Sequence, residues 1–152
     1  MKKPIIIFEG VDKSGKTTLL NRFNKLTNFK YIVLDRFTIS SKVYDCLFER
    51  NNRQYFKEIE NKFFDVFNVI IVYCYCDEDI IKQRLKEANE ELPDRLKNIR
   101  MVEKQFRYEL IAKRAINNCY IIEVDTSNDL EICLEKILNE VDAYGYSGYN
   151  SF

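Results

Sequence analysis

The sequence has no histidine and no tryptophan, and it has only four glycines and two prolines among 152 residues. The absence of histidine excludes the Ser-His and Cys-His nucleophile systems and removes the commonest side-chain ligand of transition metals. The five cysteines are odd in number and show no CxxC spacing, so we interpret them as reduced core thiols. Phosphoryl transfer needs no histidine and therefore remains open.

The sequence also lacks an excess of charge and any long apolar run. Lys plus Arg and Asp plus Glu both number 24, so no global positive field favours a long polyanion, and we expect no nucleic-acid partner. The apolar run at residues 5–8 is far too short for a signal-peptide core or a membrane span. We therefore expect a cytoplasmic protein that does not contact the membrane.

Short apolar runs alternate with helical patterns along the chain. Strands are expected at four places: 4–9, 31–34, 69–75 and 119–124. Helices are expected at five: 16–27, 41–50, 52–67, 79–86 and 93–115. This alternation predicts an α/β fold with a doubly wound parallel sheet of four to five strands flanked by helices, and a ligand site beyond the carboxyl ends of the strands. Residues 1–141 are interpreted as a single domain, and residues 142–152, rich in glycine and tyrosine, as a flexible tail.

The segment Gly-Val-Asp-Lys-Ser-Gly-Lys-Thr at residues 10–17 matches the P-loop pattern G-x-x-x-x-G-K-[ST] at every fixed position. It lies between an expected strand and an expected helix, where backbone N–H groups converge on phosphate oxygens and the helix start adds about half a positive charge. Lys16 is expected to hold the β- and γ-phosphates of ATP, and Thr17 to ligate Mg²⁺. Gly10 and Gly15 stand where the backbone must approach the ligand closely. No N-K-x-D guanine motif is present, so a GTPase is not favoured.

The wider segment Phe-Glu-Gly-Val-Asp-Lys-Ser-Gly-Lys-Thr-Thr at residues 8–18 closely resembles the P-loop of thymidylate kinases. The acid inside the loop carries the resemblance, because a generic P-loop has no need of a carboxylate beside its phosphates. In that family the acid binds the 3′-hydroxyl of the acceptor, which implies the same role for Asp12. Lys13 stands where some members carry a catalytic arginine. Ser14 and Thr18 complete the expected ATP contacts.

A second resemblance begins at Asp35, after the second expected strand. The segment Asp-Arg-Phe-Thr-Ile-Ser-Ser-Lys-Val-Tyr resembles the family pattern D-R-[YF]-x-x-S-x-x-A-Y. The likeness implies that Asp35 orients Mg²⁺ and its waters and that Arg36 grips the acceptor phosphate. It further implies that Ser40 and Ser41 line the base pocket, and that Tyr44 excludes a ribose 2′-hydroxyl.

A third resemblance places a lid near residues 86–100. By this likeness Arg95 closes over ATP and supplies positive charge to the transferring group, with Arg100 assisting and Arg84 near the nucleotide. The alternative is a solvated helix face rich in Lys, Arg and Glu. The segment Asp-Thr-Ser at residues 125–127 resembles the loop on the adenine side of the family's site.

One part of the family's acceptor site has no counterpart in this sequence. Few residues separate Thr17 from Asp35, where thymidylate kinases place an additional strand, its helices and a Phe-Pro-Arg segment. Part of the base pocket must therefore be built from other residues. The candidates are two arginines and the aromatic residues around them: Arg50, Arg53, Phe48, Tyr55, Phe56, Phe63 and Phe64.

The sequence thus predicts phosphoryl transfer from ATP, with Mg²⁺, to a deoxynucleoside monophosphate. The expected acceptor is dTMP, and the expected catalytic residues are Lys16, Asp35, Arg36 and Arg95. Two alternatives stay open. One is a deoxynucleoside kinase, in which Asp35 or Glu9 takes the proton of a 5′-hydroxyl; the other is a nucleotide-binding module without transfer activity. The resembling family commonly forms dimers, so a homodimer is compatible with this interpretation.

Overall fold

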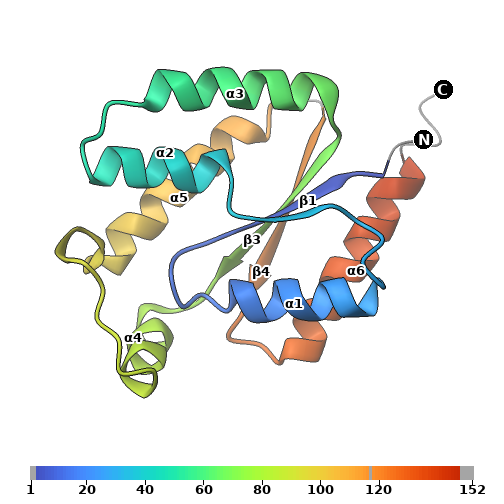
Figure 1. The fold of residues 1–152 in the computed structure, drawn as a ribbon. Helices are drawn as coiled ribbons and strands as arrows, with labels where there is room; N and C mark the ends of the chain where they lie inside the picture. The colour runs from blue at the N-terminus through green and yellow to red at the C-terminus, as the bar shows by residue number, and fades with distance from the viewer. Residues whose placement is uncertain (1–2, 117, 148–152) are drawn as a thin grey trace.

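Four strands form one sheet in which every neighbouring pair is parallel (Figure 1). The computed structural model describes residues 3–116 and 118–147 of the chain. The strands are β1 (Ile5–Glu9), β2 (Val33–Asp35), β3 (Val69–Tyr75) and β4 (Cys119–Asp125). Their order across the sheet is β2-β1-β3-β4, so the strands that end in Glu9 and Asp35 are neighbours. The α/β fold predicted from the sequence is confirmed.

Helices cover both faces of this sheet. Among the described residues they are α1 (Lys16–Leu26), α2 (Thr38–Leu47), α3 (Arg53–Val66), α4 (Glu78–Glu87), α5 (Ile99–Lys113) and α6 (Leu130–Ser147), with a short 3-10 turn, η1 (Asp94–Leu96). Helices α2, α3 and α5 pack on one face, and α1 and α6 on the other (Figure 1). Within the described ranges, no helix combines the length and the apolar character that crossing a bilayer requires.

Each central strand sends alternate side chains into two separate hydrophobic clusters. In β1, Ile5 and Ile7 pack with residues of α2, α3 and α5, whereas Ile6 and Phe8 pack with residues of α1 and α6. Both sets are almost completely buried. A strand covered on both faces must be apolar at every position, which explains the unbroken hydrophobic run in its sequence. The polar residues of the site are left to the strand ends.

The helix expected at residues 93–115 is divided in the structure. Pro93 precedes η1, and α5 begins only at Ile99. The Asn98 side chain accepts a hydrogen bond from the backbone N–H of Met101 at 3.1 Å, which satisfies one of the free donors at the helix start. This cap stabilises a new helix start six residues later than the expected one.

The C-terminal part of the chain also differs from its prediction. Helix α6, which has no counterpart among the expected helices, continues to Ser147 and so includes residues 142–147 of the expected flexible tail. Its apolar side chains provide the reason, since Ile137 and Val141 are buried and Tyr144 stacks on Tyr120 of β4, with ring centroids 5.3 Å apart. Residues 148–152 of the expected tail lie outside the described residues.

The cysteines are free thiols, but they are not all core residues. Cys74, Cys76 and Cys133 are buried, as expected. Cys46 on α2 is exposed, which corrects the interpretation for that position.

A buried ionic cluster joins the three helices on one face of the sheet. Glu60 of α3 accepts a hydrogen bond from Lys42 of α2 at 2.7 Å, and it also contacts Lys113 of α5 and the hydroxyl of Thr38. All four residues are buried. Burial raises the pKa of Glu60, but the hydrogen bonds from Lys113, Lys42 and Thr38 outweigh it and hold the pKa below its usual value. Glu60 therefore remains charged and fixes α2 against α3 and α5.

Replacing Glu60 with alanine should destabilise the protein by about 3–5 kcal/mol, because the buried Lys113 loses its counterion and the buried Lys42 keeps only Glu109, at 3.8 Å. The measurement is the free energy of unfolding in urea. Glu58→Ala, on the exposed side of the same helix, is the matched control and should change stability by no more than about 0.5 kcal/mol. Equal losses in the two variants would show that the cluster contributes no particular stability.

Candidate nucleotide-binding site

The loop between β1 and α1 is folded as a phosphate cradle. Gly10, Lys13 and Gly15 have positive φ angles of 153°, 64° and 87°, which turn the backbone back on itself between the strand and the helix. A Cβ atom at Gly10 would collide with the carbonyl oxygen of Cys74 in β3, so no larger residue fits there. The glycine spacing of the motif thus has a direct steric cause in this fold.

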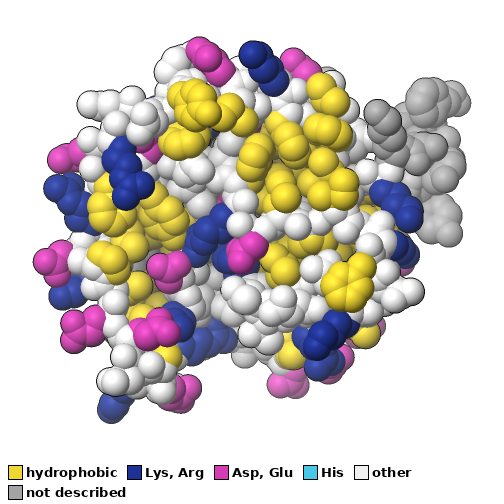
Figure 2. All heavy atoms as spheres, in the orientation of Figure 1, with side chains coloured by type: hydrophobic (Ala, Val, Ile, Leu, Met, Phe, Trp, Pro, Cys, Tyr) yellow, Lys and Arg dark blue, Asp and Glu magenta, His cyan; other side chains and the backbone are white. Residues whose placement is uncertain are grey.

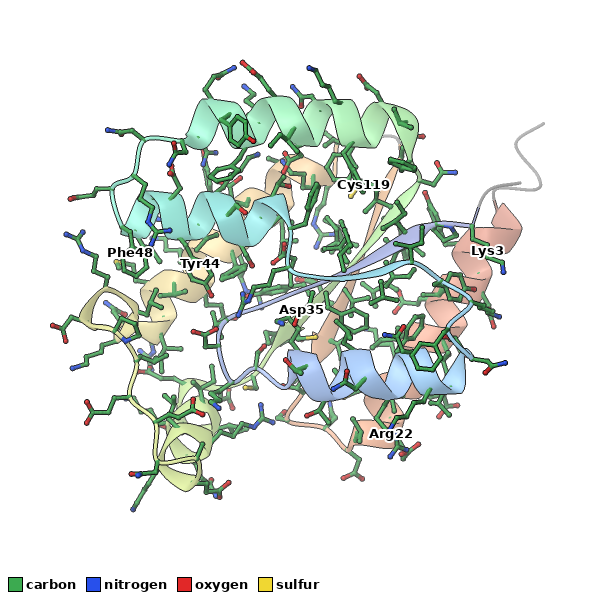
Figure 3. All side chains as sticks on the ribbon, in the orientation of Figure 1. Lys3, Arg22, Asp35, Tyr44, Phe48 and Cys119 are labelled. Carbon is green, nitrogen blue, oxygen red and sulfur yellow. The ribbon has the colours of Figure 1, made fainter. Side chains whose placement is uncertain are left out.

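The start of α1 is open to an anion. Gly15 is the capping residue, no side chain caps the helix, and its first turn contains no acidic residue. The free N–H groups and the helix dipole therefore favour negative charge at this point. Lys16 is buried, and its ammonium group pairs with the carboxylate of Asp35 at the end of β2. In Figure 3 the Asp35 side chain lies next to the start of α1.

Arg36 links the P-loop to the beginning of α2. Its guanidinium donates to the carbonyl oxygen of Gly10 at 2.7 Å, to the carboxylate of Asp12 at 2.6 Å and to the hydroxyl of Ser40 at 2.9 Å. Asp35 and Arg36 therefore face the P-loop, as their place after a neighbouring parallel strand leads one to expect. Figure 2 shows basic and acidic side chains side by side at the centre of this face, between two hydrophobic areas.

A cleft of about 1020 Å³ runs along the P-loop. We call it the P-loop cleft; its lining comes from three parts of the chain, at 11–19, 84–93 and 126–130, together with Arg36. The residues expected around ATP are all among its lining residues: Lys13, Ser14, Thr17 and Thr18. Asp12, the residue expected to bind the 3′-hydroxyl of the acceptor, also lines it. A cavity of this size can hold a nucleoside triphosphate.

Arg84 of α4 lies against the P-loop. Its guanidinium donates to the carbonyl oxygens of Lys13, at 2.8 Å, and Thr126, at 3.2 Å. The Thr126 hydroxyl in turn donates to the carbonyl oxygen of Ser14. Arg84 and Thr126 thus tie the cradle to α4 and to the loop after β4. The lid resemblance implied that Arg84 lies near the nucleotide, but its contacts with the loop backbone had no signal in the sequence.

The two arginines of the expected lid do not reach the P-loop. Arg95 donates to the carbonyl oxygen of Leu47 at 3.1 Å and pairs with Glu49 at 3.5 Å, and Arg100 pairs with Glu78 at 2.9 Å. The end of a helix carries unpaired carbonyl groups and a partial negative charge, which attracts Arg95 to the C-terminus of α2. The structure thus separates both guanidinium groups from the cradle.

Acidic and apolar residues of the same segment line the cleft instead. Between residues 87 and 93 the lining includes Glu90, Glu91 and Leu92. Glu90 pairs with Lys13 of the P-loop at 2.9 Å. The segment therefore contacts the cradle through an acid that pairs with Lys13, whereas the resemblance implied an arginine that closes over ATP.

A second cavity of about 440 Å³ runs along α2 and is called the α2 pocket here. Arg36 lines both this pocket and the P-loop cleft. The expected acceptor residues Ser40, Ser41 and Tyr44 all line it. Its remaining lining residues are Phe37, Asp45, Arg50, Asn52 and Phe56.

Glu9 at the end of β1 is an acid without solvent contact. Its carboxylate accepts hydrogen bonds from the backbone N–H of Phe37 at 2.8 Å and from the hydroxyl of Ser40. Burial raises the pKa of Glu9 to about 7, although these hydrogen bonds and the charge of Arg36 act in the opposite direction. Both oxygens are engaged by the start of α2, so Glu9 positions that helix against the sheet.

The residues expected to hold Mg²⁺ provide two oxygen groups, the hydroxyl of Thr17 and the carboxylate of Asp35. In the described part of the chain, no cluster of three or more His, Cys, Asp or Glu residues could hold a metal ion by itself. Mg²⁺ is typically held by one or two carboxylates together with substrate phosphates and waters. Thr17 lines the P-loop cleft and Asp35 contacts Lys16, the residue before Thr17, so the two groups fit a site that a bound phosphate would complete.

Together the parallel sheet and the phosphate cradle define an α/β protein with a nucleotide-binding fold. No protein-family model and no curated protein matches the sequence. Among solved structures, the chain is similar to the YorR protein from Bacillus subtilis, crystallised in complex with phosphorylated GDP. The TM-score is 0.67 and the sequence identity 22%, and the likeness covers 93% of this chain and 98% of that one. At this identity the likeness shows a shared fold.

The raised pKa of Glu9 should make stability depend on pH. The group titrates near 4.5 when unfolded and near 7 when folded, so its contribution is full below pH 4.5 and is lost as the pH rises through 7. Glu9→Gln cannot ionise and should remove this loss. The difference in unfolding free energy between variant and wild type should therefore change by up to about 3 kcal/mol between about pH 4.5 and about pH 8.

Urea unfolding at a series of pH values measures this difference. Glu58→Gln, on the exposed side of α3, controls for the general effect of removing a carboxylate. If the stability profiles of wild type and Glu9→Gln run parallel over this range, the Glu9 carboxyl does not titrate as the structure implies.

Proposed function

We propose that this protein transfers the γ-phosphoryl group of ATP to a deoxynucleoside monophosphate, with dTMP as the first acceptor to test. The proposal depends chiefly on the position of Arg36, which lines both the P-loop cleft and the α2 pocket. A side chain between two cavities, one beside a phosphate cradle and one the size of a nucleotide, can contact both the donor and the acceptor of a phosphoryl group.

The donor side is supported by the geometry of the cradle. The free N–H groups at the start of α1 and the ammonium of Lys16 point to a polyanionic ligand such as the phosphates of ATP. YorR, a protein with a similar structure, was crystallised with phosphorylated GDP, and this agrees with a nucleotide in the cleft. When bound, Mg²⁺ would neutralise charge on the transferring phosphate, and Thr17 and Asp35 would hold it.

The acceptor side is supported by the partners of Arg36. Its guanidinium is held by Asp12, Gly10 and Ser40, and a bound phosphate can replace the Asp12 carboxylate at one edge of the planar group. Asp12 would then be released to accept a hydrogen bond from the 3′-hydroxyl of the sugar. This contact with the sugar would explain why a phosphate-binding loop contains the acid Asp12.

Catalysis in this proposal consists of alignment and charge neutralisation. The oxygen of a nucleoside monophosphate is already ionised and needs no general base. Lys16 and Arg36 stabilise the negative charge that develops between donor and acceptor. A deoxynucleoside kinase would need a base near the 5′-hydroxyl. Both candidate bases are already engaged, Asp35 by the ammonium group of Lys16 and the buried Glu9 carboxylate by the start of α2. This arrangement favours a monophosphate over a nucleoside as the acceptor.

The second candidate function is a nucleotide-binding module without transfer. Such a protein needs the cradle but has no need of an arginine held between the cradle and a second pocket. The contacts of Arg36 with both parts therefore favour the enzyme. A transfer assay separates the two functions, because the module would bind ATP without forming a diphosphate product.

Phosphoryl transfer should be detected with ATP and Mg²⁺ against a panel of deoxynucleoside monophosphates, thymidine and ribonucleotides. A deoxymonophosphate should be the best acceptor.

Arg36→Ala should lower kcat/KM for the best acceptor by about 100-fold or more, because a charge on the transferring group loses its partner, whereas ATP binding should stay within a few-fold. Lys16→Ala should lose both ATP binding and phosphoryl transfer. Arg22→Ala, exposed on α1 and paired with Glu131, is the matched control. Unchanged turnover in Arg36→Ala would remove that residue from the acceptor site.

Tyr44 should control the choice between deoxyribose and ribose. Its ring packs between the guanidinium of Arg36, 5.4 Å from its centroid, and the ring of Phe106. Tyr44→Ala should reduce the preference for dUMP over UMP by about 10-fold, and Tyr44→Phe by less, because the ring is retained. The measurement is the ratio of the two kcat/KM values. A ratio that stays constant in Tyr44→Ala assigns Tyr44 to packing alone.

A further inference from the structure

The α2 pocket has two chemically different ends. Along α2 its lining residues recur at helical spacing, from Phe37 through Ser40 and Tyr44 to Asp45. At 1.5 Å per residue, this row extends about 12 Å, comparable to the distance from the phosphate to the far edge of a nucleotide base. Arg36 marks the end beside the P-loop. The opposite end is the turn from α2 to α3, where Figure 3 labels Phe48 beyond Tyr44.

This turn, residues 48–52, is called the α2–α3 corner here, and its backbone is tightly specified. Glu49 and Asn51 both adopt left-handed conformations, with φ angles of 54° and 58°. The buried Asp45 accepts the backbone N–H of Arg50 on its carbonyl oxygen at 3.0 Å and that of Asn52 on its carboxylate at 2.9 Å. Because Asp45 fixes the backbone N–H groups of Arg50 and Asn52, the backbone at both residues has a defined position beside the pocket.

Arg50 differs from the neighbouring arginines in its partners. Arg53 pairs with Glu109 at 2.5 Å, and Arg95 pairs with Glu49. Within residues 3–116 and 118–147, Arg50 has no ion-pair partner, and its guanidinium lies over the ring of Phe48, 4.8 Å from the centroid. Stacking orients the plane of the guanidinium but leaves its N–H groups available. Arg50 is therefore a donor in the lining of the pocket that the protein itself does not neutralise.

The aromatic residues that were candidates for the base pocket also differ in their surroundings. Phe56 lines the α2 pocket, whereas Phe63 and Phe64 pack in the hydrophobic cluster beneath α3 and Tyr55 is exposed. An aromatic ring in the wall of a nucleotide pocket offers a surface on which a base can stack. One arginine, one amide and one ring thus line the end of the pocket away from Arg36.

We infer that the α2–α3 corner recognises the base of the acceptor nucleotide, with Arg50 and Asn52 as its hydrogen-bonding residues. It selects a base with a carbonyl group at C4 of a pyrimidine or C6 of a purine over a base with an amino group at that position. This inference rests on the proposed function, because it takes the α2 pocket to be the acceptor site. The corner would then form the part of the base pocket for which the sequence has no segment between Thr17 and Asp35.

The selection follows from the chemistry of the guanidinium. Arginine offers only donors and does not lose its proton in proteins. Thymine and uracil present the acceptor O4, and guanine presents O6 and N7, so each can receive its N–H groups. Cytosine and adenine present an amino group at the equivalent position, where two donors would face each other. The favoured acceptors are therefore dTMP, dUMP and dGMP, and dCMP and dAMP are disfavoured.

Calorimetric binding of the five deoxymonophosphates without ATP, followed by transfer assays with ATP and Mg²⁺, tests the inference. Wild type should prefer dTMP, dUMP and dGMP over dCMP and dAMP by about 10- to 100-fold. Arg50→Ala should abolish most of this preference, and Arg50→Lys should keep part of it, because an ammonium still donates. Lys57→Ala, an exposed cation on α3, is the matched control and should leave the preference unchanged. Arg50 is exposed, so its variants should fold, and circular dichroism checks this.

The outcomes separate this inference from the proposed function. Equal affinity of wild type for all five nucleotides overturns it, and so does a preference that survives in Arg50→Ala. Selective binding that depends on Arg50, without transfer to any acceptor, supports the base-reading corner and contradicts the kinase proposal. Transfer to a deoxymonophosphate with a base preference that does not depend on Arg50 supports the kinase proposal and contradicts the role of the corner in base recognition.

Discussion

The hydrogen bonds of the Arg36 guanidinium are the contact on which the geometry of the site depends. They connect the carbonyl oxygen of Gly10 and the carboxylate of Asp12 in the phosphate cradle with Ser40 at the start of α2. The distance between the cradle and the α2 pocket is therefore set by one planar group. Arginine suits this position because its five donors have a fixed arrangement and can hold several acceptors at once. An ammonium group has no such rigid fork.

Two buried acids fix the position of α2 against the sheet and α3. Glu9, at the end of the central strand β1, binds the first turn of α2, and Glu60 of α3 binds Lys42 one turn further along. Both acids are buried, so leaving any of these partners unpaired would be costly. The wall of the pocket is thus ordered before a ligand enters. A site ordered in advance loses less conformational entropy when it binds.

The features that could be predicted from the sequence have local signals. The strands appear as short apolar runs because both faces of the sheet are covered, and the cradle appears as a spacing of glycines that its backbone angles require. Residues 142–147 differ from the prediction, because their glycine and tyrosine composition is typical of a tail, whereas the apolar residues of α6 pack on β4. The start of α5 also differs from the prediction, because Pro93 precedes only the short turn η1 and Asn98 caps the helix.

The sequence by itself determined the class of fold and the cradle at residues 10–17, because both depend on the order of residues over short distances. Tertiary structure decided which arginines surround the cradle. Arg36 and Arg84 lie there, whereas Arg95 and Arg100 bind Glu49 and Glu78. An arginine side chain is long and mobile, and its position depends on acceptors that are distant along the chain. Those acceptors become neighbours only when the sheet and its helices have formed.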